Sequence, residues 1–177
     1  GYDGEVAQVL KFDLEVMGCK IVPEGGADYL LSGGNRNSVN GILKDAAGNS
    51  GFNKRYNGGN LRQQAHALSN DVIKAITGRD GIAHTRILYK MKTGPRAYEV
   101  FVSDYDGHQP VALTGDNTIV ESPLWAPGNG EVFYTSWMMI GGVLNTTVIQ
   151  HKMNNGARTV FSRFKGLNTV GAVSPQG

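Results

Sequence analysis

Cysteine is nearly absent from this sequence, which contains only Cys19. A lone cysteine cannot form an internal disulfide, and no histidine lies near it in sequence at the spacing of a metal site. The histidines His66, His84, His108 and His151 are too scattered to predict a shared metal ion. We therefore expect neither a disulfide framework nor a metal or other cofactor.

Long apolar runs and blocks of like charge are also missing. No apolar stretch is long enough to cross a bilayer, and the first residues do not follow the basic-then-apolar order of a secretory signal. Lysine and arginine total 17 against 15 acidic residues, and both kinds are spread along the chain, for a net charge of +2. The sequence therefore predicts no nucleic-acid partner and no membrane insertion.

Short catalytic and nucleotide-binding motifs are missing as well. The sequence contains no Gly-x-Ser-x-Gly elbow and no Gly-x-x-x-x-Gly-Lys-Ser/Thr phosphate loop. Residues 104–108, Asp-Tyr-Asp-Gly-His, resemble the start of a calcium loop but lack its later ligands, so a hairpin turn is the better interpretation. We expect a protein that is not an enzyme.

Helical periodicity is present in two stretches of the first half, where apolar residues recur at three- and four-residue steps. Each stretch is bounded by residues that suit helix caps. The predicted helices, with their expected caps, cover residues 6–17 (Asp3 and Gly18) and residues 61–76 (Asn60 and Gly78).

Between these helices, short segments with strand character are separated by glycine and asparagine groups that suit tight hairpins. The segments cover residues 19–22, 29–32, 39–43 and 52–56, and Cys19 is expected to be a packed strand residue. An order of helix, strands and helix favours two helices on one face of a small mixed sheet. We therefore expect an α/β N-terminal domain over residues 1–79.

Beyond residue 79 the helical pattern stops, and short apolar or alternating segments follow at short intervals. The segments with strand character cover residues 82–90, 98–103, 111–114, 131–137, 146–151 and 158–164. Two connecting dipeptides, Asp106-Gly107 and Asn155-Gly156, are typical of type I′ hairpin turns, in which both central residues have a positive φ. The second half is therefore predicted to be all β.

An internal repeat suggests how these strands are organised. Residues 125–130, Trp-Ala-Pro-Gly-Asn-Gly, are echoed by residues 173–177, Val-Ser-Pro-Gln-Gly, about 48 residues later, and the two hairpin dipeptides have nearly the same spacing. A period of roughly 40 to 50 residues with about four short strands is typical of propeller blades. The alternative is a meander or sandwich with two similar hairpins by chance.

The repeat predicts an incomplete, all-β propeller of about one and a half to two blades over residues 80–177. Three strands precede the first Trp-x-Pro element, whereas the next repeat has four, so the first blade is expected to lack its innermost strand. Incomplete blades leave apolar faces and strand edges open. We therefore expect a fragment of a longer protein that self-associates when isolated.

Several motifs in a fixed order resemble the TolB family. Residues 60–66, Asn-Leu-Arg-Gln-Gln-Ala-His, followed by Ile-Thr-Gly at residues 76–78 and by residues 81–89, resemble the domain junction of that family. The resemblance continues through residues 98–107 and through residues 121–127, Glu-Ser-Pro-Leu-Trp-Ala-Pro. It covers most of the chain from about Tyr29 onward, and it is specific because it joins a helix motif, a linker and a blade motif.

The resemblance implies an α/β domain packed on a six-bladed propeller in the periplasm. Members of the family are non-enzymatic protein-binding scaffolds of the Tol-Pal system, which supports outer-membrane integrity and cell division. They bind the peptidoglycan-associated lipoprotein Pal, and bacteriocins exploit the system for import. The TolB-like role implied for this chain is therefore protein binding in the cell envelope, in a system also associated with protein transport.

The chain departs from the family pattern at three places. The usual Ser-Pro-Asp-Gly turn is replaced at residues 126–130 and 174–177. The family's N-terminal segment that contacts TolA has no counterpart before Gly1, so the resemblance does not extend to TolA binding. Residues 138–144 are an apolar insertion, expected in a loop between strands, that the family pattern does not explain.

Partner-binding residues are expected where the chain leads into the innermost strands, because these segments gather at the mouth of a propeller channel. The repeat register places the following residues there: Ile119, Val120, Glu121, Ser122, Pro123, Leu167, Asn168, Thr169 and Val170. Trp125 is expected on an inner strand as core. Packing roles at the domain junction are expected of Arg62, His66, Thr85 and Arg86, where Arg62 and His66 lie one helical turn apart and can bond each other or the linker.

Two other functions are compatible with this sequence. The first is the propeller front part of a peptidase whose hydrolase domain lies beyond Gly177. The second is a sensor domain for a small molecule, supported only by the apolar residues 138–144. A downstream Gly-x-Ser-x-Gly element would favour the peptidase, and further Pro-Asp-Gly repeats would favour the scaffold.

Overall fold

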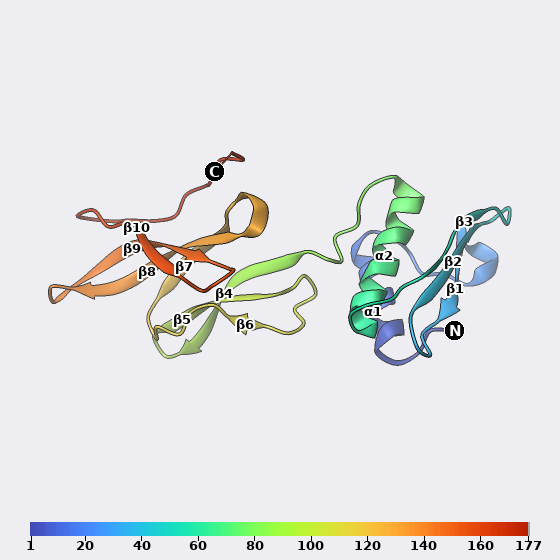
Figure 1. Cartoon of the computed structure of the whole chain (residues 1–177), viewed down its shortest axis with the longest axis horizontal. Coiled ribbons are helices and arrows are strands. Elements are labelled where there is room, and N and C mark those ends of the chain that lie inside the picture. Colours follow the sequence, from blue (N-terminus) through green and yellow to red (C-terminus); the bar gives the residue numbers. More distant parts are fainter. Residues whose placement is uncertain (177) are drawn as a thin grey trace. The chain divides into compact units, whose positions relative to one another are not determined.

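The computed structural model describes residues 1–176, which fall into two compact units, one over residues 1–85 and one from residue 86 onward (Figure 1). Neither helix among the described residues is both long enough and apolar enough to cross a bilayer. The compact units are defined by contacts in the structure. The predicted domain bounds, 1–79 and 80–177, stay a prediction.

The first unit contains two α-helices, a short 3-10 turn and one sheet. In chain order these are α1 (Gly4–Val16), η1 (Glu24–Gly26), β1 (Tyr29–Gly34), β2 (Asn40–Asp45), β3 (Ser50–Arg55) and α2 (Leu61–Thr77). The sheet order is β1-β2-β3 and both pairs are antiparallel, so the prediction of a mixed sheet is wrong. The strands follow one another through short connections, and a parallel pair needs a much longer crossover.

The helix boundaries follow from the residues at their ends. Asn60 and Gln63 exchange two hydrogen bonds at the start of α2, in which the Asn60 side chain accepts from the Gln63 amide at 2.8 Å. Gly78 ends α2 in the left-handed conformation with φ of 72°, which glycine adopts without steric cost. Both predicted caps of this helix are confirmed.

The end of α1 explains why residues 19–22 form no strand. The amides of Gly18 and Cys19 donate to the carbonyls of Glu15 and Leu14, the paired bonds of a Schellman motif, and Gly18 has φ of 93°. Cys19 thus completes a helix terminus and packs against the core, and the strand predicted at residues 19–22 is wrong. At the other end Asp3 is the N-cap, but its side chain accepts a hydrogen bond from Asn35 instead of from the helix.

The core of the first unit lies among both helices and β2. Its buried apolar side chains come from α1, from α2 and from the start of the sheet: Val6, Val9, Leu10, Leu14, Val39, Leu43, Ala65, Leu68, Val72 and Ile73. The apolar stripes predicted for the two helices are the faces that meet here. The first unit therefore has a hydrophobic core of its own.

The second unit consists of two antiparallel sheets. The first has the order β4-β5-β6, and the second has the order β10-β9-β8-β7. The elements are β4 (Arg86–Gly94), β5 (Ala97–Asp104), β6 (Val111–Ala112), β7 (Val120–Trp125), η2 (Pro127–Asn129), β8 (Glu131–Ile140), β9 (Val143–Lys152) and β10 (Arg158–Ser162). A second core, which includes Val100, Val120 and Tyr134, lies between the two sheets.

Three strands are thus followed by four, each paired with its neighbours in sequence. Trp125 ends β7 and packs against the second core. The echo of the Trp-x-Pro element is less regular, because Val173 lies in no strand. That these sheets are blades of a propeller stays a prediction.

Two local predictions in this unit are wrong. In the turns at residues 106–107 and 155–156 only the glycines have a positive φ, so neither turn is type I′. The Asn155 side chain instead accepts a hydrogen bond from the Ala157 amide, which holds the turn in another form. Residues 138–144 are not a loop insertion: they extend β8 and β9 to a tight turn at Gly141 and Gly142.

Candidate interaction surface

The first predicted partner segment, residues 119–123, forms the start of β7. The Ile119 carbonyl accepts from the Trp137 amide at 2.9 Å, and Val120 is fully buried in the second core. The pairing of β7 with β8 shifts between Glu121 and Leu124, and Ser122 has φ of 51° there. Pro123 has no amide hydrogen to offer the ladder, which suits this bulge. Ser122 is exposed, whereas Glu121 and Pro123 are half-buried.

The second predicted segment, residues 167–170, is fixed by one buried side chain. The amide nitrogen of Asn168 donates to the Thr146 hydroxyl at 2.7 Å, and its side-chain amide donates to the Thr146 carbonyl at 3.0 Å. Its side-chain oxygen accepts from the Ser162 hydroxyl and the Phe164 amide. Asn168 is therefore a clamp that fixes the loop to β9. On either side of it, Leu167 and Thr169 are exposed.

The structure brings the two segments together on β8. Glu121 is paired with Thr135 across the β7–β8 ladder, and the hydroxyl of Thr135 accepts from the Val170 amide at 3.1 Å. The Trp137 indole, two residues further along β8, donates to the Glu121 carboxylate at 3.4 Å. The candidate interaction surface thus consists of Glu121, Ser122, Leu167 and Thr169, supported from below by buried Val120 and Asn168.

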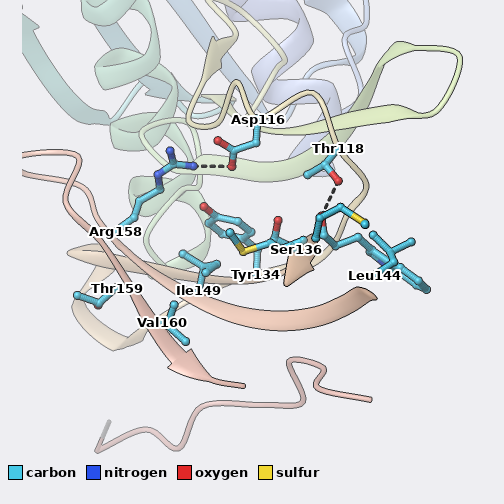
Figure 2. Close-up of a pocket in the computed structure, with 12 residues that line it drawn as sticks. Asp116, Thr118, Tyr134, Ser136, Leu144, Ile149, Arg158, Thr159 and Val160 are labelled. Atoms are coloured by element: carbon cyan, nitrogen blue, oxygen red, sulfur yellow. Dashed lines mark hydrogen bonds and ion pairs between the residues drawn. The ribbon is translucent and has the colours of Figure 1, made fainter. Parts of the chain in front are cut away.

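A pocket of about 620 Å³ opens between β8, β9, β10 and the loop before β7, and none of the four residues of this surface lines it. Figure 2 shows the ion pair between Arg158 and Asp116 at one end and Leu144 at the other. The Arg158 guanidinium lies 2.5 Å from the Asp116 carboxylate, and hydrogen bonding to Asp116 is the main reason that the pKa of Arg158 is raised. Burial raises the pKa of the Tyr134 hydroxyl at the floor of the pocket.

The pocket lining suits contact better than chemistry. Its residues include no histidine or cysteine, and its one carboxylate, Asp116, is already paired with Arg158. Apolar side chains supply much of the wall, among them Met138, Met139 and Ile149. Sequence reasoning missed this pocket because its walls come from four separate segments.

The residues predicted for the domain junction have partners within their own units. Arg62 pairs with Glu5 at 2.9 Å, and the His66 ring lies 2.8 Å from the Asp13 carboxylate, so both tie α2 to α1. The predicted bonds of Arg62 and His66 to each other or to the linker stay a prediction. The Thr85 hydroxyl donates to the Ile82 carbonyl at 2.7 Å. In the second unit, the Arg86 guanidinium lies over the Trp125 ring.

Comparison with known proteins gives a consistent set of relatives. The chain is 30% identical over 192 aligned residues to the Tol-Pal system protein TolB of Legionella pneumophila strain Corby, covering 93% of the chain and 45% of that relative. It is 35% identical over 109 residues to the Tol-Pal system protein TolB of Azoarcus sp. strain BH72, covering 62% of the chain and 24% of that relative. No protein-family model matches.

The fold also has a solved counterpart. The crystal structure of TolB from Acinetobacter baumannii matches with a TM-score of 0.83 and 23% identity, covering 100% of this chain and 51% of that one. At that identity the likeness shows the fold alone. The chain matches curated relatives over most of its own residues, and it spans about half of their length.

Proposed function

Because this chain is a TolB homologue that covers about half of TolB, we propose that it is a non-enzymatic binding component of a Tol-Pal type system. The observation that carries the proposal is the 30% identity over 93% of the chain, an alignment that extends well into both compact units. The TolB-like fold agrees with this family assignment. Periplasmic location and a role in outer-membrane integrity and cell division belong to the proposal.

The proposed partner is the peptidoglycan-associated lipoprotein Pal, bound through the candidate interaction surface. Two segments that are distant in sequence meet there at Thr135, and the surface combines exposed Ser122, Leu167 and Thr169 with the half-buried Glu121 carboxylate. Protein interfaces commonly have an apolar centre and a polar rim. On this surface Leu167 is the apolar side chain, and Ser122 and Thr169 are the small polar ones. The two sheets of the second unit are, in this proposal, the first blades of a propeller.

Titration calorimetry of the purified chain with purified Pal tests the proposal. The wild-type chain is expected to bind, and Glu121→Lys and Thr169→Trp are each expected to weaken binding by about tenfold or more, because one reverses a charge and the other adds bulk at the contact. Matched controls are Glu24→Lys and Thr93→Trp, which make the same changes at exposed positions away from the surface.

The outcomes separate the partner from the site. A wild-type chain that does not bind Pal would refute the partner. Binding that neither Glu121→Lys nor Thr169→Trp weakens would leave the partner in place and refute the surface. Equal weakening by the control variants would also refute the surface, because the effect would then not depend on its position.

A further inference from the structure

The hairpin formed by β8 and β9 ends in an exposed tip without charge. Residues 132–150 contain no aspartate, glutamate, lysine or arginine. The hairpin turns at Gly141 and Gly142, and its apolar side chains lie in the solvent on both sides of the turn. The exposed fractions are 40% for Met138, 66% for Met139, 61% for Val143 and 50% for Leu144. Natural proteins seldom leave such a cluster exposed without a use for it.

A second exposed segment lies at the same end of the sheet. The loop after β10 carries Phe164 and Leu167, each 79% exposed, together with the exposed cations Arg163 and Lys165. The Asn168 clamp fixes this loop to Thr146, which is two residues beyond Leu144. In Figure 1 the orange hairpin tip and the red loop after β10 lie at one end of the four-stranded sheet. We call the six exposed apolar residues the apolar tip: Met138, Met139, Val143, Leu144, Phe164 and Leu167.

The charged residues of the loop after β10 are all of one sign. Arg163 and Lys165 alternate with the apolar residues of the loop, and residues 163–176 contain no acidic residue. Elsewhere in this unit Asp116 is paired with Arg158, and the half-buried Glu121 carboxylate accepts from the Trp137 indole. Apolar side chains flanked by free cations are the composition that binds the surface of an anionic bilayer.

We propose that the apolar tip inserts into the interface of a bilayer that contains anionic lipids, so that the chain docks peripherally on a membrane surface. The aliphatic side chains enter the boundary between headgroups and acyl chains, and Arg163 and Lys165 lie among the headgroup phosphates. Trp137, half-buried at the base of the tip, lies at the depth where tryptophan is favoured in membrane proteins. This proposal does not depend on binding to Pal.

A membrane surface fits the tip better than a protein groove does. The apolar groups project from a hairpin and a loop. Residues 132–150 and 163–176, which carry them, contain no acidic residue that could pair with a basic protein partner. The sequence-based expectation of no membrane insertion assumed a continuous basic or apolar run. Peripheral docking is a different mode, because two segments more than a dozen residues apart combine only in the fold.

Vesicle co-sedimentation tests the proposal on the whole chain. The wild-type chain is expected to bind vesicles of phosphatidylcholine mixed with phosphatidylglycerol, and to bind vesicles of phosphatidylcholine alone at least about tenfold more weakly. Met139→Asp combined with Val143→Asp is expected to lower binding to the anionic vesicles by about tenfold or more. Arg163→Gln combined with Lys165→Gln is expected to lower it by roughly tenfold and to reduce its salt dependence.

Two controls keep the test decisive. Val16→Asp combined with Ile21→Asp places the same two charges at positions that are 50% and 53% exposed in the first unit, and this variant is expected to bind vesicles as the wild type does. In a Trp125→Phe chain, quenching of Trp137 emission by brominated acyl chains reports insertion without any change at the tip. Absence of wild-type binding, unchanged binding of the tip variants, or no quenching of Trp137 would overturn the proposal. A dimer in solution that Met139→Asp abolishes, without vesicle binding, would assign the tip to a second copy of the chain.

Discussion

At the scale of the residue, Asn60 illustrates how a single side chain defines a helix. Its side chain and backbone both bond Gln63, so two amides at the start of α2 are satisfied. Asn60→Ala removes one of these bonds and is expected to lower the free energy of unfolding by about 1 kcal/mol. Urea titration followed by circular dichroism measures the loss. Asn57→Ala, at an exposed position outside the helix, is the control and is expected to cost less than half as much.

A second residue links stability to pH. The His151 ring is buried, and its Nδ1 has no hydrogen-bond partner among the described residues. Burial, and after it the charge of Arg158, lowers the pKa of His151 below its usual value of about 6.5. Protonation therefore favours the unfolded chain, so the stability contributed by neutral His151 is complete above about pH 6.5 and is lost as the pH falls below it.

His151→Gln is accordingly expected to flatten the acid side of the curve of unfolding free energy against pH. Urea titrations at several pH values between about 5 and 8 measure this slope. The comparison uses slopes because the substitution also changes packing in the core. A slope that His151→Gln leaves unchanged would contradict the role of this ring.

The sequence could predict local partners but not distant ones. Asn60 and Gly78 were identified from residue type alone, because a cap is formed by neighbours in sequence. Glu5 and Asp13, which bond Arg62 and His66, lie on a helix more than fifty residues earlier. No local pattern encodes those contacts, since only the packing of α1 against α2 brings the side chains together.

At the scale of the element, the approach of β2 to α2 depends on a missing side chain. A Cβ atom added at Gly41 would lie 2.5 Å from the Leu68 Cδ1 atom, which is closer than real contacts allow. Gly41→Ala is therefore expected to lower the free energy of unfolding by about 1 to 3 kcal/mol through overpacking. Gly115→Ala is the control, because a Cβ there meets nothing within 4 Å. Equal losses in the two variants would contradict the close packing of Leu68.

The β8–β9 hairpin depends on glycine for a different reason. Gly141 and Gly142 have φ values of 58° and 80°, the pair of positive angles that a two-residue hairpin turn needs. Gly142→Val is expected to destabilise the chain by about 1 to 2 kcal/mol, and Gly142→Asn by less, because asparagine tolerates the left-handed region. Thermal unfolding followed by circular dichroism ranks the two variants. The reverse ranking would contradict the turn geometry.

This hairpin also shows why part of the candidate site escaped sequence analysis. Residues 138–144 form a continuous apolar run without the alternation that marks a half-buried strand. The prediction of a loop insertion there rests on the family pattern, which does not explain this run. Both faces of the hairpin tip are exposed, which removes the alternation. Asn168 was predicted to contact a partner, whereas its buried hydrogen bonds hold the loop in place. Burial of a polar residue cannot be read from its type.

At the scale of the whole molecule, each compact unit has a hydrophobic core of its own. The core of the first unit draws its buried side chains only from residues 6–73, and that of the second only from residues 100–149. A piece of the chain comprising residues 1–85 is therefore expected to fold alone. Circular dichroism of this piece should show helix and a cooperative thermal transition. A piece without a cooperative transition would mean that its core depends on the second unit.

The general organisation followed from the sequence better than the details of pairing did. Helical stripes, glycine-rich connections and family motifs predicted helices and a sheet followed by an all-β part, in agreement with the TolB-like fold. The turn types and the antiparallel sheet of the first unit were not predicted correctly. Strand direction depends on which segments meet in space, and strand propensity alone does not specify it.

The edge strands of the second unit differ in a way that affects behaviour at high concentration. The three-stranded sheet ends in β6, which pairs through only Val111 and Ala112, whereas the four-stranded sheet ends in the longer β10 with exposed Val160 and Phe161. A longer apolar edge offers more unpaired backbone groups to an incoming strand. Fibril growth, where storage or overexpression provokes it, is therefore expected to start at β10 rather than at β6, and a lysine placed at Val160 is expected to delay it.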